Sequence, residues 1–311
     1  MSASHPTSTG LTSYQTLPRR TFYATIASLM LGMLLAALDQ TIVGTAMPRV
    51  IADLGGFDHY TWVVTAYLIA STISIPIVGK LSDLHGRKPY YLAGITLFLA
   101  GSALCGAAQD MTQLILFRGF QGIGAGVMQS TAFTVVGDLF PPARRGRIQG
   151  VFGSVFGLAS IVGPIVGGSI TDHLSWRWVF YVNLPLGLVV LAALALAFPN
   201  IRPRRTHRGV DYRGAALLVA ALVPLLLALT WGGSVYAWTS PEEVALLAVA
   251  IAMGALFLWN ESRVPEPILP LSLFRNHIVG VSLAIVFLSA IGMFGAILFI
   301  PLFIQGVLGG S

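Results

Sequence analysis

The sequence contains few charged residues and almost no cysteine, and these shortages exclude several classes of protein. Charged side chains make up 10% of its 311 residues, whereas an average soluble domain carries about 25%. The single cysteine, Cys105, cannot form a disulfide within the chain, and its place in an apolar run favours a packing role. The sequence shows no Ser/His/Asp set, no cluster of metal ligands and no phosphate-binding loop. We therefore expect neither an enzyme nor a cofactor or metal site.

Long apolar runs dominate the composition instead. Hydrophobic residues make up 55% of the chain, and the mean hydropathy is +0.79. A helix needs about 20 residues to cross ~30 Å of hydrocarbon. Nine runs are long enough, at residues 22–45, 60–78, 90–108, 112–136, 148–170, 178–198, 214–232, 242–260 and 277–300. The sequence thus predicts an all-α integral membrane protein.

Basic residues are distributed unevenly between the predicted loops. When alternate loops are assigned to opposite sides, Arg49 and Arg177 fall on one side and all other loop Lys and Arg residues on the other. Because Lys and Arg in short loops are retained in the cytoplasm, this predicts a cytoplasmic N-terminus in a multi-pass protein of the cell membrane. The net charge of +6 then reflects topology and the lipid bilayer, and we expect no nucleic-acid partner.

Asp39 and Arg118 are the two ionisable residues that lie well inside predicted spans. An Asp or Arg at the centre of a span costs roughly 2.5–3.5 kcal/mol, so such residues usually face a cavity or a partner. Counting along each helix places both in the outer half of the membrane. Two interpretations remain open: the residues pair, or each bonds neighbouring polar groups, simply to permit burial, or they carry a function.

The loop after the second run has a distinctive pattern, with the sequence GKLSDLHGRKP at residues 79–89. It resembles the loop between spans 2 and 3 of the major facilitator superfamily, which implies a transporter whose two helical bundles rock against each other. The resemblance assigns a conformational role to Gly79, Asp83, Gly86, Arg87 and Lys88. Asp83 is expected to accept bonds from Arg87 or to cap the next turn.

Two further segments resemble the drug:proton antiporters of this superfamily. Residues 38–43 (LDQTIV) look like the first-span signature of the fourteen-span EmrB/QacA type, which implies that Asp39 binds protons or cationic substrate. Residues 114–126 resemble the fourth-span motif, which implies a role for Arg118 in proton movement. Burial disfavours a charged carboxylate and a nearby guanidinium favours it, so a relative movement of the two groups would couple to proton uptake and release.

The fifth run resembles the antiporter motif GxxxGPxxGG, with Ala159 in place of the first glycine. The matching residues are Gly163, Pro164, Gly167 and Gly168, and the resemblance implies export. Ordinary close packing of helices through small residues is the competing interpretation. Residues 175–187 (SWRWVFYVNLPLG) resemble a further signature of the fourteen-span branch.

These features together predict the fold of the major facilitator superfamily, but not all of it. The runs at 214–260 match the two extra spans of fourteen-span members, and a single further run follows. The expected parts are a disordered cytoplasmic tail (1–21), a six-span bundle (22–198), a basic cytoplasmic linker (199–213), two linker spans (214–260) and the incomplete start of a C-terminal bundle (261–311). We therefore expect a fragment of a longer transporter.

The favoured function is export of lipophilic or cationic drugs, or of other small molecules, coupled to inward proton flow. An exporter of a specific metabolite or siderophore with the same fold is the first alternative, and a truncated, non-transporting membrane scaffold is the second. The expected partners are a small-molecule substrate and protons, together with the missing C-terminal half or an accessory efflux protein.

Overall fold

The computed structural model describes residues 18–198 and 211–306, and these form helices and connecting loops without a β-strand. The helices are α1 (Arg19–Leu54), α2 (Thr61–His85), α3 (Arg87–Ala107), α4 (Met111–Leu139), α5 (Pro142–His173), α6 (Trp178–Tyr181), α7 (Asn183–Ala197), α8 (Tyr212–Trp231), α9 (Pro241–Glu261) and α10 (His277–Gly306), with short 3₁₀ turns η2 (Phe57–His59) and η3 (Leu271–Arg275). The predicted all-α membrane fold is confirmed.

Seven of the helical segments are long and apolar enough to cross a membrane: α1, α2, α3, α5, the combined α6–α7 segment, α8 and α9. The predicted fourth span, α4, is not among them, because polar residues such as Arg118 and Gln121 lower its hydropathy. Helix α10 begins with the apolar segment His277–Gly292.

The predicted boundaries differ from the structure at both polar segments. α1 begins at Arg19, so residues 19–21 are helical although the sequence assigned them to a disordered tail. The rest of that tail lies outside the described residues, and so does the greater part of the predicted basic linker, 199–210. Arg213, the last linker residue, lies in α8.

Local sequence explains where several helices begin and end. Asp110 caps α4 by accepting a bond from the Gln113 amide at 2.8 Å, and Ser240 caps α9 in the same way ahead of Pro241. Between α2 and α3 the chain reverses at Gly86, whose φ of 98° is accessible mainly to glycine.

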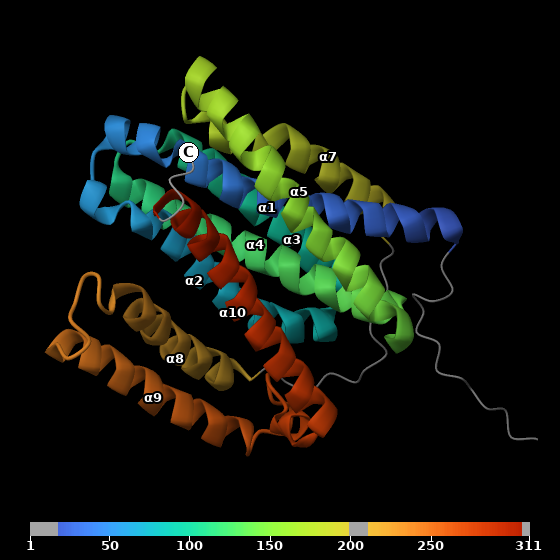
Figure 1. Cartoon of the computed structure of the whole chain (residues 1–311). Helices are drawn as coiled ribbons and strands as arrows, with labels where there is room; N and C mark the ends of the chain where they lie inside the picture. Colours follow the sequence, from blue (N-terminus) through green and yellow to red (C-terminus); the bar gives the residue numbers. More distant parts are fainter. Residues whose placement is uncertain (1–17, 199–210, 307–311) are drawn as a thin grey trace, which may run out of the picture.

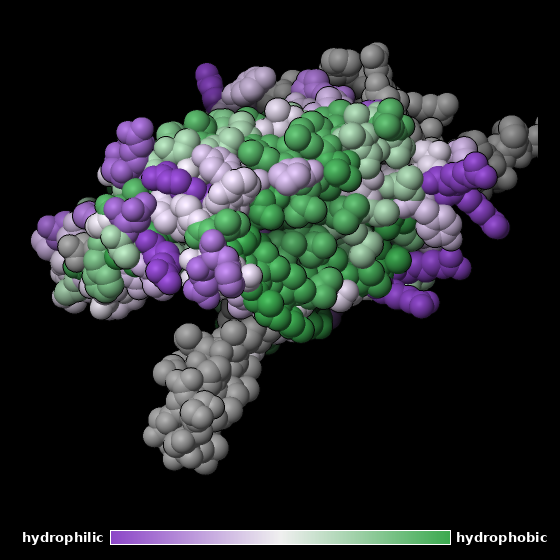
Figure 2. Space-filling view, turned by 90° about the horizontal axis from the view of Figure 1, so that it is seen from above, coloured by the Kyte–Doolittle hydropathy of each residue, from purple (hydrophilic) through white to green (hydrophobic). Residues whose placement is uncertain are grey.

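Helix α4 is the centre of the first bundle. It packs most extensively against α2 and α3, whereas α1 packs chiefly against α5. Figure 1 shows α5 and α7 on one side of this bundle and the α8–α9 hairpin on the other, next to α2. A broad apolar band lies between the polar ends of the helices on the face shown in Figure 2.

Candidate functional site

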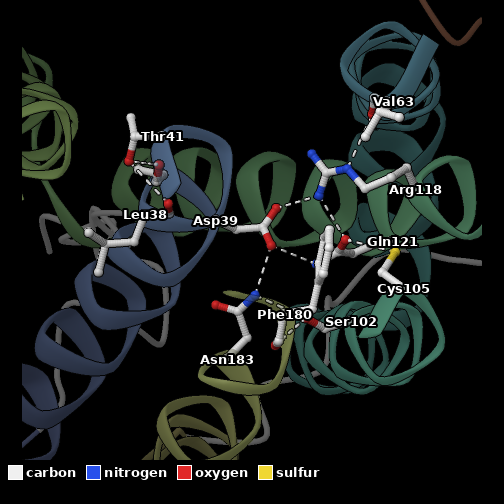
Figure 3. Close-up of polar contacts among 11 residues, drawn as sticks. Leu38, Asp39, Thr41, Val63, Ser102, Cys105, Arg118, Gln121, Phe180 and Asn183 are labelled. Carbon is white, nitrogen blue, oxygen red and sulfur yellow. Dashed lines mark hydrogen bonds and ion pairs between the residues drawn. The ribbon is translucent and has the colours of Figure 1, made fainter. Parts of the chain in front are cut away.

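Asp39 on α1 and Arg118 on α4 form an ion pair in the interior of the bundle. Arg118 Nη1 donates to Asp39 Oδ2 at 2.6 Å, and the two residues are 1% and 0% exposed. Figure 3 shows the carboxylate and the guanidinium facing each other between the helices. In the structure the two charges therefore pair with each other.

Two amide side chains complete the surroundings of the carboxylate. Asp39 Oδ1 accepts from Gln121 Nε2 at 2.9 Å and from Asn183 Nδ2 at 2.7 Å. Asn183 is the first residue of α7, so the site joins three helices that are distant in sequence. Arg118, Gln121 and Asn183 all donate to Asp39. Three donors suit a charged carboxylate.

The guanidinium of Arg118 is bound on its other sides as well. Its Nη1 donates to Gln121 Oε1 at 2.8 Å, and its Nε donates to the backbone oxygen of Val63 at 3.2 Å. The ring of Tyr67 covers the guanidinium, with a distance of 4.1 Å from its central carbon to the ring centroid. These contacts compensate for the loss of water around a buried cation.

Close backbone packing of α4 against its neighbours fixes the position of Arg118. A side chain on Gly122 would collide with the backbone of Tyr67 in α2, and one on Gly124 would lie 2.8 Å from the oxygen of Gly94 in α3. Gly122 and Gly124 of the fourth-span motif therefore serve helix contact, as small residues do in membrane bundles.

The site lies between two apolar clusters of the bundle core. Along α1, Leu35 belongs to one cluster and Ile42 to the other, with Asp39 between them. Along α4, Leu114 and Ala125 belong to different clusters, and Arg118 and Gln121 lie between them. The polar network is thus enclosed by apolar side chains on both sides, where an unpaired charge would be costly.

Sequence reasoning identified the two charges of this site but missed its uncharged members. Gln121 was part of the quoted fourth-span motif and Asn183 part of residues 175–187, yet neither received a role. Ser102, which accepts from Asn183 Nδ2 at 2.9 Å, was not considered. A side chain with a polar amide inside a long apolar run is the signal that could have found the first two.

The loop residues between α2 and α3 form a second polar cluster, which does not include Asp39 or Arg118. Arg87 pairs with Asp83, as predicted, and also donates to Ser82 Oγ at 2.9 Å. Its Nε binds Asp138 Oδ2 at 3.2 Å, a partner at the far end of α4 that was not foreseen. This cluster ties the start of α3 to the end of α4.

The remaining loop residues connect α2 and α3 to other helices. Lys88 Nζ donates to the oxygen of Ala195 in α7 at 2.7 Å. Lys80 pairs with Glu266, in the segment between α9 and η3, at 2.8 Å. A Cβ on Gly79 would lie 3.3 Å from Ser130 Oγ of α4, which is tight but not a collision. With Gly86 at the reversal, the five predicted loop residues lie together at one end of the bundle.

The fifth-span motif lies against α1 beside the ion pair. A side chain on Gly163 would overlap Thr41, two residues after Asp39, and one on Gly167 would lie 3.1 Å from the oxygen of Ile42. Gly168 has open space around it. Helix α5 runs without interruption through Pro164. Close packing thus accounts for two of the three motif glycines.

Comparisons with known proteins bear on the whole arrangement. Residues 29–311 match the sequence profile of the Major Facilitator Superfamily. The chain belongs to this family. It is 48% identical over 286 residues to the multidrug transporter protein MdtP of Bacillus subtilis. This match covers 92% of the chain and 53% of that protein.

Other members of the Major Facilitator Superfamily give the same assignment. The chain is 43% identical to multidrug resistance protein 3 of Bacillus subtilis, over 92% of the chain and 56% of that protein. It therefore spans about half the length of these relatives. The crystal structure of the human organic anion transporter MFSD10 shares the fold, with a TM-score of 0.53 and 21% identity over 74% of the chain and 60% of that structure.

Proposed function

We propose that this chain forms part of a proton-coupled exporter of lipophilic or cationic small molecules, with Asp39 as the proton-binding group. The observation that carries the proposal is the fully buried Asp39–Arg118 pair, 2.6 Å apart, at the centre of the bundle. A buried ionisable pair in a membrane bundle is costly to maintain, which favours a functional role.

The chemistry of the pair supports proton exchange. While Asp39 is charged, it balances Arg118, and the site as a whole is neutral. A proton on Asp39 removes the negative charge and leaves the guanidinium uncompensated in an apolar core, which favours rearrangement of the helices. Because proton binding and ion pairing compete for the same carboxylate, they are alternatives in a transport cycle.

A small cleft beside the pair, with about 20 Å³ of free space in this conformation, is lined by side chains that suit lipophilic substrates. Its lining consists of Met33, Ala36, Gln40, Tyr67, Ser71, Ala125, Met128, Gln129 and Phe156. Methionine and aromatic side chains adapt to varied apolar ligands, and the amides offer hydrogen bonds. Tyr67 belongs to this lining and also stacks on Arg118. A substrate in the cleft would thus touch a residue that touches the ion pair.

The named functions of relatives support drug export in particular. The two Bacillus subtilis proteins are called a multidrug transporter and a multidrug resistance protein. We assign the chain to the fourteen-span type, in which α8 and α9 are the extra pair of spans, and we place its N-terminus in the cytoplasm. The rest of the activity would require a second bundle of the kind that facilitators rock against the first.

The test is proton-driven efflux of ethidium by cells and inverted membrane vesicles expressing the complete reading frame that encodes this chain. We expect Asp39→Asn to abolish efflux driven by a pH gradient, because asparagine keeps the size of the side chain but cannot exchange a proton. Asp110→Asn is the matched control, since Asp110 is exposed and asparagine caps a helix equally well. Intact proton-driven efflux by the Asp39→Asn protein would refute the proposal.

A further inference from the structure

Asn183 is buried where α6 passes into α7, in the sixth predicted span. It is 1% exposed, and it follows Val182, which separates α6 from α7. Val182 keeps helical dihedrals, with φ −59° and ψ −26°, so α6 and α7 continue one another as a single apolar segment. Pro185 has no amide to donate to Tyr181, so one helical hydrogen bond is missing there. From the start of α7 the Asn183 side chain reaches Asp39.

The hydrogen bonds around Asn183 fix which end of its amide faces Asp39. The oxygen of Phe180 is a backbone carbonyl and can only accept, so Ser102 Oγ, 2.8 Å away, must donate its one proton there. Ser102 then accepts from Asn183, at 2.9 Å, which requires the nitrogen end of the amide. That same nitrogen lies 2.7 Å from Asp39 Oδ1.

The donor and the acceptor in each hydrogen bond between Phe180 and Asp39 are therefore fixed. With its orientation set by Ser102, the amide nitrogen can donate to Asp39 but cannot accept from it. A donor favours the charged carboxylate over the neutral acid. Removing the donor would make Asp39 easier to protonate.

We propose that Asn183 is a positioning residue that holds Asp39 in its charged form and so sets the pH range over which proton exchange occurs. The proposal rests on the function proposed above. It adds α7 to the coupling site and gives Ser102 a role as the residue that orients Asn183.

Other charged or titratable groups also face Asp39, and they are the same in each variant below. They are Arg118 from α4, Tyr67 from α2 and Cys105 from α3. Helix α7 has no titratable side chain, and those of α5 lie near its two ends. A change at Asn183 therefore alters one donor and no charge.

The experiment measures protonation of Asp39 directly, by infrared titration of the purified, lipid-reconstituted protein. The signal is the protonated-carboxyl absorbance that disappears in Asp39→Asn. We expect Asn183→Leu, which keeps the volume but has no donor, to move this titration to higher pH. Ser102→Ala should move it in the same direction but less, because the amide remains and only its orientation is freed. Ser28→Ala is the matched control, a buried serine that donates to Ala24 away from the site.

Two results would overturn the proposal: an unshifted titration in Asn183→Leu, or a shift of equal size in Ser28→Ala. Should Asn183→Leu fail to fold, the comparison of Ser102→Ala with Ser28→Ala decides the matter in the same way. The pH profile of ethidium efflux should move with the infrared titration. The titration needs no transport, so the two proposals can fail separately. A shifted titration in Asn183→Leu together with intact efflux in Asp39→Asn would refute the proposed function but not the role of Asn183.

Discussion

Tyr67 stacks on Arg118, with 4.1 Å between the guanidinium carbon and the ring centroid, and the same tyrosine lines the cleft beside the ion pair. One side chain thus contacts both the charged site and the small cleft that we propose for substrate. A desolvated cation–π contact contributes about 2 kcal/mol, which is enough to influence the position of the guanidinium.

Substitutions at Tyr67 should distinguish the contribution of its aromatic ring to efflux from that of its hydroxyl. We expect Tyr67→Phe to keep ethidium efflux within about threefold of wild type, because phenylalanine preserves the stack. Tyr67→Leu should reduce efflux roughly tenfold, because the aromatic face is lost. Efflux rates at saturating ethidium measure both. Equal rates in the two variants would show that the stack is irrelevant to transport.

Removal of one member of the ion pair should cost more stability than replacement of both. We expect Arg118→Ala to destabilise the protein by about 3–5 kcal/mol, since Asp39 would be left buried and uncompensated. The double variant Asp39→Leu with Arg118→Met should be closer to wild type in stability, although inactive in proton-coupled efflux. Thermal unfolding in detergent measures the stability of each variant. A double variant whose loss of stability equals the sum of the two single losses would argue against direct coupling of Asp39 and Arg118.

Gly124 should be intolerant of even a methyl group. Its Cβ would lie 2.8 Å from the oxygen of Gly94 and against the backbone of Phe98, so we expect Gly124→Ala to destabilise the bundle by about 1–3 kcal/mol. Gly119→Ala is the control, because its Cβ would have only Ala66 nearby, at 4.0 Å. The same unfolding assay compares the two variants, and similar stabilities would contradict the close α3–α4 packing.

The Lys80–Glu266 pair predicts that opposite charges, rather than particular residues, attach the segment after α9 to the end of α2. The two side chains are 16% and 26% exposed, so the pair is only partly screened by water. We expect Lys80→Glu to weaken the attachment and increase cleavage of residues 262–270 by added protease. Combining it with Glu266→Lys should restore protection. Lys88→Glu, which changes the same charge elsewhere in the loop, serves as the control.

The sequence was most informative where a charge conflicted with its surroundings. Asp39 and Arg118 stand out in apolar runs because burial of a charge is expensive, and their pairing could be anticipated from similar estimated depths. Asn183 and Gln121 carry no charge, so their cost is smaller and their direction depends on helix rotation.

Long-range partners were harder to predict for a related reason. The pairing of Arg87 with Asp83 spans one helical turn and follows from local geometry. Its contact with Asp138 joins residues 51 positions apart and depends on how α4 crosses the bundle. Likewise, α4 carries polar residues such as Arg118 and Gln121 that contact other helices of the bundle, so its composition alone does not mark it as a span.

The backbone packing of α4 onto α2 and α3 has a mechanical consequence. These three helices cannot slide past one another without collisions at Gly122 and Gly124, and α1 is similarly seated on α5 at Gly163. Close packing thus joins α2, α3 and α4 to one another and α1 to α5, and the salt bridge between Asp39 and Arg118 links α1 to α4. In the function proposed above, protonation of Asp39 would remove this link and leave the backbone packing within α2–α4 and between α1 and α5 unchanged.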